Sequence, residues 1–492
     1  MTTGDGRVMN VDFTTPPIDD QGKDDVAKGA LAMQKSTLRL GHEFSDRVRM
    51  SRRRWLAAVG AAVAATTLSD VPVLARQATP VAAPMASPVA VDRDWRGERW
   101  VGTWSAAPQT PFPAFEDFPS QLIELDNQTV RQIVRIVAGG DQVRVRLTNA
   151  YGDAPLVIGA AHIALREAET RIDPATDRTL TFSGSPSFTI PAGATALSDP
   201  VDMVVPALTE LAISIFLPEP SPSTTVHGFA FQTNFISPGG DFTAASEMPV
   251  EASPQSWMFL SGVDVLVSQP TGVVVAFGDS ITDGAFSTLD ANRRWPDVLA
   301  ERLAADPPGR AMTVLNQGIS GNRLLHDEAG ELGLAFGQNA LARLDRDVLS
   351  QPGVTHLIVL EGINDIGLPA AFAASEQAVT ADELIGALRQ LVERAHEREI
   401  AVFGGTILPF EGTEMYFSAE GEVTRQTVNE WIRTGGAFDA VIDFDAAVRD
   451  PSQTTRLLPM FDSGDHLHPN DAGLRAMGEA IDLSVFQSGG GA

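Results

Sequence analysis

The sequence predicts two folded domains, an antiparallel β-sandwich followed by an α/β domain with a parallel sheet covered by helices on both faces. The chain has 492 residues, which is long enough for two or three buried cores. Over residues 98–269, short apolar runs alternate with Gly, Pro, Ser and Asp, which is typical of antiparallel strands and turns. From residue 270 onward, apolar runs alternate with amphipathic helical stretches, which indicates βαβ units.

Residues 1–75 have the pattern of a leader that contains an export signal. Arg52 and Arg53 precede a mild, Ala-rich apolar run that ends at Leu68, a pattern typical of the twin-arginine route. The run is too short and too weakly apolar for a stable membrane span. We therefore expect a protein that the twin-arginine machinery exports, secreted or held in the cell envelope; a buried N-terminal helix is the alternative.

The limits of this leader stay open. Both Met1 and Met50 are candidate starts, and Ala75 stands among small residues that suit signal cleavage. Residues 76–97 are rich in Ala, Pro and Val, a composition that favours an extended linker over a packed domain.

Composition excludes several classes of function. The formal net charge of -27 disfavours binding to nucleic acid or to an anionic membrane surface. The chain has no cysteine, which excludes disulfides, thiolate nucleophiles and cysteine-ligated zinc. Lys23, Lys28 and Lys35 are the only lysines, so Ser-Lys dyads and Schiff-base chemistry are excluded from residue 36 onward. A neutral or weakly polar substrate fits these properties best.

Residues 98–269 predict the β-sandwich. Two runs of alternating apolar and polar residues flank Gly139 and Gly140, which indicates a β-hairpin. Helical periodicity is almost absent here, and several further strand-like runs follow. The hairpin would carry four arginines on or near its solvated face: Arg131, Arg135, Arg144 and Arg146.

Residues 270–485 predict the α/β domain, and residues 486–492 a flexible tail. Five strand-like runs alternate with helical stretches: VVVAF, MTVLNQG, THLIVLEG, AVFGGTI and AVIDF. Parallel strands that are buried on both faces have such continuous apolar runs. In these sheets the chemistry lies at the carboxyl ends of the strands.

Small polar clusters follow three of these runs, and a fourth lies near the C-terminus. They are residues 278–280 (GDS), 317–321 (QGISG), 362–365 (GIND) and 465–469 (DHLHP). The carboxyl ends of parallel strands meet at one edge of a sheet, so these clusters can share a site.

The side chains in these clusters match the needs of acyl transfer. A serine hydroxyl becomes nucleophilic when an imidazole accepts its proton, and a carboxylate fixes the tautomer of that imidazole. Ser280 supplies the hydroxyl, and Asp465 and His468, three positions apart, supply the pair. The backbone N–H of Ser280, the backbone N–H of Gly321 and the amide of Asn364 are candidate donors to the oxyanion.

The order GDSITDG, NQGISGNR, GIND and DHLHP resembles the four blocks of the SGNH hydrolases, the GDSL-type esterases and lipases, over residues 273–481. The resemblance implies a three-layer α/β/α sandwich that needs no metal and no cofactor. It also implies that Ser280 is the nucleophile, His468 the base and Asp465 its acid, with Gly321 and Asn364 completing the oxyanion hole. Residues 98–269 lie outside it, and the whole is similar to secreted bacterial members that have an extra N-terminal β-domain.

Alternatives remain for single residues. Ser280 could instead cap the helix that follows it, a common position for serine. His466 competes with His468 as the base, and both histidines with Asp462 and Asp465 could form a small metal cluster, although no helix-borne His-x-x-x-His is present. The common α/β-hydrolase motif Gly-x-Ser-x-Gly is absent from the sequence.

The sequence thus predicts a secreted serine esterase or lipase that hydrolyses small-molecule or polysaccharide esters through an acyl-enzyme. Within the same class, the alternative is a carbohydrate O-acetylesterase with the β-domain as a binding module. From another class, the alternative is a glycan-binding envelope protein with a vestigial site. The presence of all four blocks favours the enzyme.

Overall fold

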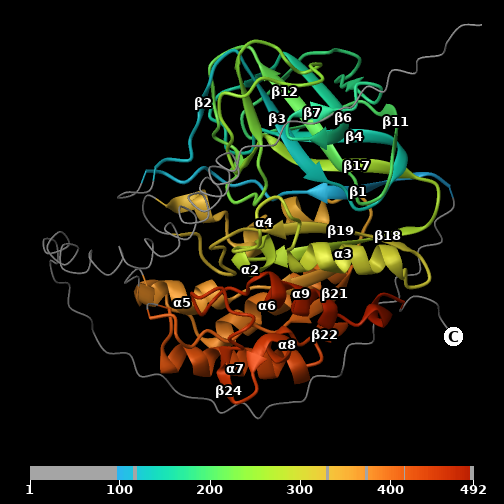
Figure 1. Ribbon diagram of the computed structural model, residues 1–492. Coiled ribbons are helices and arrows are strands. Elements are labelled where there is room, and N and C mark those ends of the chain that lie inside the picture. The colour runs from blue at the N-terminus through green and yellow to red at the C-terminus, as the bar shows by residue number, and fades with distance from the viewer. Residues whose placement is uncertain (1–96, 115–118, 329–331, 372–374, 415, 488–492) are drawn as a thin grey trace, which may run out of the picture. The chain divides into compact units, whose positions relative to one another are not determined.

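The structure is a computed structural model that describes residues 97–114, 119–328, 332–371, 375–414 and 416–487 (Figure 1). The predicted leader, with its start and cleavage site, and the linker up to residue 96 lie outside the described residues, as does the tail from residue 488. Within the described ranges, no helix combines the length and the apolar content that crossing a bilayer requires.

The N-terminal strands form two antiparallel sheets, which we call the β-domain (Figure 1). The first sheet contains β1 (Arg99–Ser105), β4 (Gly140–Thr148), β10 (Thr195–Leu197), β11 (Val201–Val205) and β17 (Leu260–Val267). The second contains β3 (Gln128–Arg135), β6 (Ala160–Ala168), β7 (Arg171–Ile172), β8 (Arg178–Thr179), β12 (Glu210–Leu217) and β15 (Phe235–Gly239). Three short pairs complete the domain: β2 (Glu124–Leu125) with β13 (Ser221–Pro222), β5 (Leu156–Ile158) with β9 (Phe188–Ile190), and β14 (Val226–His227) with β16 (Trp257–Met258). The predicted sandwich-like arrangement is confirmed.

The predicted hairpin around Gly139 and Gly140 is wrong. Strand β3 pairs with β12 and β15, whereas β4 pairs with β17, β10 and β11, so the two strands belong to different sheets. The glycines lie where the chain crosses from one sheet to the other. A Cβ at Gly139 would come within 2.5 Å of the Val205 carbonyl oxygen, so the glycine serves close packing.

The expected solvated position of Arg131 is also wrong, because its side chain is fully buried. Its Nε donates to Ser214 Oγ at 2.8 Å, and its terminal nitrogens donate to the carbonyls of Thr170, Phe242, Thr243 and Ala245. Burial lowers the pKa of Arg131 to about 10. Its five hydrogen-bond acceptors replace the water that the guanidinium loses on burial. The buried arginine ties several loops to the second sheet.

The C-terminal part, which we call the α/β domain, contains five parallel strands in the order β19-β18-β20-β21-β22 (Figure 1). Their bounds are β18 (Thr271–Gly278), β19 (Ala311–Gly318), β20 (Val354–Leu360), β21 (Ala401–Gly405) and β22 (Ala440–Ile442). The first strand, β18, therefore lies between β19 and β20, and the connections leave it in opposite directions. Such a switch point forms a crevice at the carboxyl ends of the strands, where ligands bind.

Helices cover this sheet on both faces. They are α2 (Ser280–Asp283), α3 (Trp295–Ala305), α4 (Ala340–Leu344), α5 (Ile363–Ala371), α6 (Ala381–His396), α7 (Ala419–Thr434), α8 (Phe444–Val448) and α9 (Asp471–Ala480). Short turns add η1 (Gly333–Phe336), η2 (Asp345–Leu349), η3 (Ser375–Gln377) and η4 (Leu483–Gln487), and β23 (Arg449–Asp450) pairs with β24 (Gln453–Leu457). Helices α3, α8 and α9 pack together, as do α4, α6 and α7. The usual right-handed crossover rule predicts that these two groups cover opposite faces of the sheet. The predicted fold class is confirmed.

Local sequence explains these elements. Every residue of β20, VTHLIVL, is buried, as expected for a strand covered on both faces. Helix α6 begins with a capping box in which the Thr380 hydroxyl accepts from the Glu383 N–H and the Glu383 carboxylate accepts from the Thr380 N–H. Its apolar stripe of Leu384, Leu388 and Leu391 faces the core.

The α/β domain extends beyond its expected C-terminal limit. The side chain of Phe486 in η4 is 2 % exposed and packs on the rings of His356 and Phe403, so ordered structure continues past residue 485.

The β-domain packs directly on the α/β domain. The Gly102 N–H donates to the Pro352 carbonyl at 3.0 Å, and a Cβ at Gly102 would lie 2.8 Å from Leu315 Cδ1. Strand β1 thus runs closely beside β19.

Candidate active site

Ser280 stands where β18 turns into α2. Asp279 caps this helix, because its Oδ1 accepts from the Ile281 N–H at 2.9 Å. The helix folds back over the strand because Gly278 has no side chain: a Cβ there would lie 2.2 Å from Thr282 Oγ1. The serine therefore opens the helix at the switch point of the sheet.

The structure brings the hydroxyl of Ser280 and the predicted His–Asp pair together. Ser280 Oγ lies 2.7 Å from His468 Nε2, and His468 Nδ1 lies 2.6 Å from Asp465 Oδ2. Both distances are short hydrogen bonds. With Asp465 accepting from Nδ1–H, Nε2 carries the lone pair that faces the serine. The three residues have the arrangement of a nucleophile, a base and an orienting acid.

The second oxygen of Asp465 is held by its own loop. Asp465 Oδ1 accepts from the backbone N–H groups of Leu467 at 2.9 Å and His468 at 2.8 Å, and from Ser463 Oγ at 2.9 Å. These bonds fix the carboxylate with Oδ2 directed at the imidazole. A separation of three residues is enough because the loop folds around the carboxylate.

Electrostatics adapt this pair to proton transfer. Burial alone would raise the pKa of Asp465, but the charge of His468 and the hydrogen bonds to it hold that pKa well below its usual value. Burial alone would lower the pKa of His468, but the charge and hydrogen bond of Asp465 raise it above its usual value. Asp465 is therefore ionised over the whole working range, and His468 is a strengthened base.

His466 points to a different partner. Its Nδ1 lies 2.5 Å from Asp462 Oδ2, its side chain is about half exposed, and its backbone has a φ of 65°. The neighbouring Gly412 packs on the ring, since a Cβ there would lie 2.9 Å from His466 Cγ. Of the two histidines, the structure places only His468 against Ser280. Among the described residues, no group of three His, Asp or Glu side chains forms a set of metal ligands.

Gly321 and Asn364, the other two predicted donors to the oxyanion, lie on the neighbouring strand-end loops. Gly321 has a φ of 81°, in the left-handed region that glycine adopts without strain, and Phe336 packs so closely that a Cβ would lie 2.1 Å from its Cδ1. The Asn364 side chain is buried, and its Nδ2 donates to the Asn322 carbonyl at 2.8 Å. An amide nitrogen has two N–H bonds, so a second one is left as the candidate donor.

Tyr416 and Asp365 orient these loops. The Tyr416 hydroxyl donates to Asn364 Oδ1 at 3.2 Å, which sets which end of the amide is nitrogen. Asp365 accepts from the N–H groups of Leu324 at 2.7 Å and Leu325 at 3.0 Å, and so ties the loop after Gly321 to α5. Tyr416 lies in the segment between β21 and α7.

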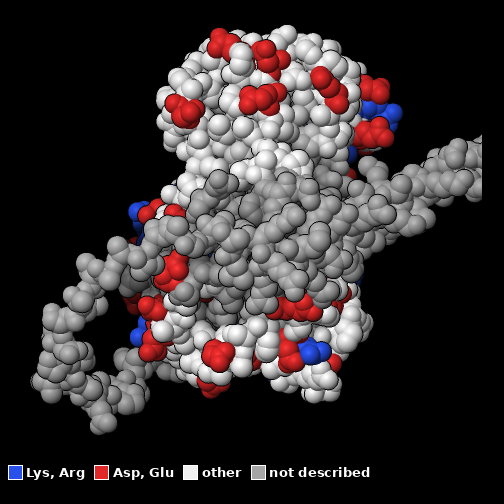
Figure 2. Space-filling model, turned by 90° about the vertical axis from the view of Figure 1, so that its left-hand side faces the viewer, with Lys and Arg blue, Asp and Glu red and all other residues white. Residues whose placement is uncertain are grey.

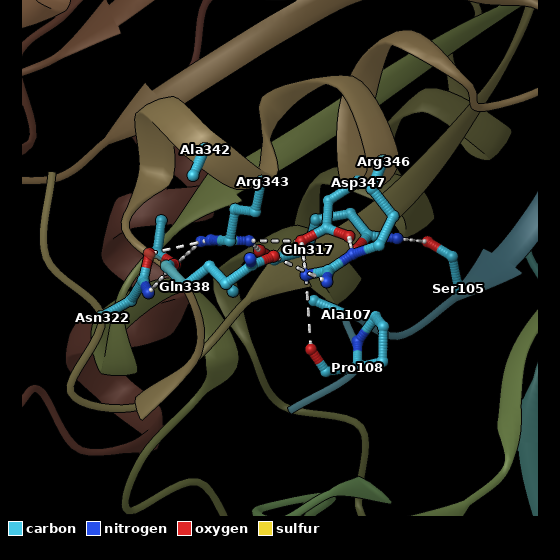
Figure 3. A network of polar contacts seen from close by, with 12 residues as sticks. Ser105, Ala107, Pro108, Gln317, Asn322, Gln338, Ala342, Arg343, Arg346 and Asp347 are labelled. Atoms are coloured by element: carbon cyan, nitrogen blue, oxygen red, sulfur yellow. Dashed lines mark hydrogen bonds and ion pairs between the residues drawn. The ribbon is translucent and has the colours of Figure 1, made fainter. Parts of the chain in front are cut away.

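Arg343 is the central side chain beneath the strand ends, and no sequence pattern predicted a role for it. Its side chain is fully buried, and it donates to the carbonyls of Gly278 at 2.9 Å and Gln317 at 2.7 Å, which lie at the ends of β18 and β19. Figure 3 shows the guanidinium between Asn322, whose Oδ1 accepts at 2.8 Å, and Asp347, whose Oδ2 lies 3.2 Å away. The Arg343 guanidinium therefore links the ends of β18 and β19, which lead to the site residues.

We expect the change Arg343→Met to lower the free energy of unfolding by about 3–5 kcal/mol, because it removes the charge partner of buried carboxyl groups. Two strand-end carbonyls also lose their donor, so kcat should fall as well. Chemical denaturation followed by circular dichroism measures the first effect. The control is Arg475→Met in α9. The Arg475 guanidinium lies 2.8 Å from Glu479 on the surface, so its removal should lower the free energy of unfolding by less than about 0.5 kcal/mol. Equal destabilisation by the two changes would contradict this role.

Two buried carboxyl groups lie close to this arginine. Burial raises the pKa of Asp279 to about 7 and the pKa of Glu361 well above its usual value. The charge of Asp365 raises both pKa values further, and the charge of Asp279 adds to the rise at Glu361. Glu361 Oε1 lies 3.2 Å from Arg343. Protons retained on these groups reduce the unpaired negative charge behind the nucleophile.

These observations define a class of protein. A doubly covered parallel sheet with a Ser–His–Asp constellation at its switch point is the architecture of an α/β/α hydrolase domain. The model of the GDSL-like Lipase/Acylhydrolase family matches residues 276–476 of this chain. The resemblance of the four sequence blocks to the GDSL-type esterases and lipases is thereby confirmed, and it supports hydrolysis of carboxylic esters.

The solved structures that match part of this chain are distant from it. A putative lipolytic protein of the G-D-S-L family from Desulfitobacterium hafniense is 23% identical, with a TM-score of 0.31, over 42% of this chain and 96% of that protein. An acetylxylan esterase from Geobacillus stearothermophilus is 24% identical, with a TM-score of 0.32, over 42% and 91%. The aryl esterase of M. smegmatis is 16% identical, with a TM-score of 0.33, over 42% and 95%. No significant match is found among curated proteins.

Proposed function

We propose that this protein is an exported serine esterase that hydrolyses carboxylic esters through an acyl-enzyme on Ser280. The observation that carries the proposal is the continuous chain of short contacts, 2.7 Å from Ser280 Oγ to His468 Nε2 and 2.6 Å from His468 Nδ1 to Asp465 Oδ2. A serine that only caps a helix has no need of a histidine oriented by a carboxylate.

In the first half of the reaction, Ser280 Oγ attacks the ester carbonyl carbon while His468 Nε2 takes the hydroxyl proton. The carbonyl oxygen becomes an oxyanion, and the N–H groups of Ser280, Gly321 and Asn364 stabilise it. The carbon–oxygen bond to the alcohol then breaks, and His468 gives its proton to the departing alkoxide. Asp465 stabilises the imidazolium between these two transfers.

In the second half, water takes the place of the alcohol. His468 removes a proton from the water, the hydroxide attacks the acyl carbon of the acyl-enzyme, and the same N–H groups hold the second oxyanion. The bond to Ser280 Oγ breaks, His468 returns the proton to the serine, and the free acid leaves. No cofactor enters the cycle.

The surface beside the triad supports a neutral substrate with an apolar portion. Phe286 is 46 % exposed, has a φ of 64°, and holds its ring 5.3 Å from that of His468. An apolar ring at this position suits the acyl or alcohol group of an ester. On the face that Figure 2 shows, Asp and Glu side chains are prominent among the described atoms and Lys and Arg are few, in keeping with the net charge of -27.

Export is part of the same proposal. The pair Arg52–Arg53 followed by an Ala-rich run supports the twin-arginine route, which carries folded proteins. A chain without cysteine needs no oxidative folding after it leaves the cell.

The test combines turnover with covalent trapping. Purified protein should release p-nitrophenol from p-nitrophenyl acetate and butyrate, and a fluorophosphonate should block this turnover by forming one adduct, which peptide mass spectrometry places on Ser280. Absence of turnover, or an adduct on another residue with Ser280 unmodified, would overturn the proposal.

The pH dependence follows from the state of His468. Only the neutral imidazole accepts the proton of Ser280, so kcat/KM rises as pH rises through the pKa of His468. Because Asp465 raises that pKa above the usual value of about 6.5, the midpoint of the rise should lie above pH 6.5. A profile of kcat/KM from pH 4 to 9 measures it, and a midpoint below about 6 would contradict the strong pairing of Asp465 with His468.

A further inference from the structure

A buried histidine of the β-domain reaches the helix that carries the nucleophile. His227, in β14, is 4 % exposed; its Nδ1 lies 2.9 Å from the Ala107 carbonyl and its Nε2 lies 2.9 Å from Asp283 Oδ1. Both ring nitrogens thus have a partner, one in each domain. A buried ring with contacts at both nitrogens is held in one orientation, and here it bridges two domains.

Asp283 passes this contact on to the oxyanion loop. It is the last residue of α2, three positions after Ser280. Its Oδ1 faces His227, while its Oδ2 accepts from the Ser320 N–H at 2.9 Å and from the Ser320 hydroxyl at 2.6 Å. The carboxylate is 2 % exposed, so its bonds are shielded from competing water.

Ser320 is the residue before Gly321, whose N–H is a candidate donor to the oxyanion. Holding the N–H and the hydroxyl of Ser320 restricts rotation about the peptide that links the two residues. The direction of the Gly321 N–H therefore depends on Asp283, and the position of the Asp283 carboxylate depends on His227. A shift of about 1 Å in such a donor can cost roughly a hundred-fold in rate.

The β-domain also holds the other side of Gly321. Phe336 covers this glycine, and its ring lies 5.1 Å from the ring of Phe112 in the β-domain. Gln109 Nε2 donates to the Ala335 carbonyl, and the Thr110 N–H donates to the Leu334 carbonyl at 3.2 Å. The residues that precede and cover the glycine are thus both anchored by the β-domain.

A further contact joins the β-domain to the arginine network beneath the site. Gln317 Nε2, at the end of β19, donates to Ser105 Oγ at 2.6 Å, and Arg346 donates to the Pro108 carbonyl (Figure 3). Figure 3 shows these two contacts on the side of the network opposite Asn322. The β-domain therefore meets the α/β domain at the strand end that leads to Gly321.

We propose that His227 is a positioning residue of the active site: it holds Asp283, which holds the Ser320–Gly321 peptide of the oxyanion hole. The β-domain is then a structural part of the catalytic site. This role rests on the proposed esterase function. Because the oxyanion exists only in the transition state, loss of His227 should lower kcat and leave KM nearly unchanged.

The experiment compares His227→Leu, His227→Gln and a matched control with p-nitrophenyl acetate. We expect His227→Leu to lower kcat roughly a hundred-fold with KM within about two-fold, and His227→Gln, whose amide can donate one of the two bonds, to lower it less. The control is His162→Gln, since His162 also pairs with an aspartate of the β-domain, Asp177, at 3.0 Å. It should leave kcat and KM unchanged. Melting temperatures identify variants that merely fail to fold.

A double-mutant cycle with Ser320→Ala tests the chain of contacts. The effects of His227→Leu and Ser320→Ala on kcat should be less than additive, because both act through Asp283. The rate at which a fluorophosphonate labels Ser280 provides a second readout, which does not depend on the choice of ester. Unchanged kcat in folded His227→Leu, a rise in KM alone, or additive effects would overturn the positioning role. Wild-type protein without turnover or labelling would overturn the esterase function as well.

Discussion

Replacing His468 with alanine is expected to lower kcat for ester hydrolysis by roughly 10⁶-fold, the loss that follows removal of the base from other Ser–His–Asp sites. The physical reason is that Ser280 Oγ lies 2.7 Å from His468 Nε2 and, among the residues that the structure describes, pairs with no other acceptor for its proton. Initial rates with p-nitrophenyl butyrate measure the effect, and the residual rate should equal that of Ser280→Ala.

The chain offers a matched control two residues away. His466 has its own carboxylate partner, Asp462, at 2.5 Å, whereas Ser280 Oγ is paired with His468. The change His466→Ala should therefore leave kcat within a few-fold. If His466→Ala abolishes turnover while His468→Ala does not, the assignment of the base is wrong.

Replacing Asp465 with asparagine should lower kcat by roughly 10⁴-fold with little change in fold. Asparagine still offers one oxygen to the N–H groups of Leu467 and His468, so the loop keeps its form. Its amide nitrogen would donate to His468 Nδ1, which places the ring proton on Nε2, where a lone pair is needed to accept from Ser280.

Asp462→Asn is the control for this change, because it alters the same kind of His–Asp contact in the same loop. Its kcat should stay within a few-fold of wild type. A ratio near one between the two variants would show that Asp465 does not set the tautomer of His468. Rates at pH 7 to 9 separate a tautomer effect, which persists at high pH, from a simple shift in the pKa of His468.

Much of the fold could be predicted because its signals are local. Continuous apolar runs mark β18, β19, β20 and β21, and a capping box marks the start of α6. The hairpin at Gly139 failed because strand pairing is a long-range property: β3 is bonded to β12, about 80 residues later in the chain. Alternating runs around two glycines fit a hairpin and a crossing between sheets equally well.

In the candidate site, too, residues with a local sequence signal could be predicted, whereas residues that depend on long-range contacts could not. Ser280, Asp465 and His468 stand in short polar clusters, so their place in the site could be predicted from the sequence. Arg343 left a weaker signal: Ala340, Arg343, Leu344 and Asp347 form one buried helical stripe, and two of its four members are charged. No local pattern distinguishes His227, because its partner Asp283 lies in the other domain.

The order in which the chain is made has a consequence for when the protein becomes reactive. Ser280 precedes His468 by 188 residues, and the β-domain precedes both. At about 5–20 residues per second, translation reaches the base roughly 10 to 40 s after the nucleophile. During that interval the β-domain and the first strand of the sheet are complete, yet the serine has no partner. Under the proposed mechanism, hydrolysis therefore begins only when the segment before α9 has been made and His468 has docked against Ser280.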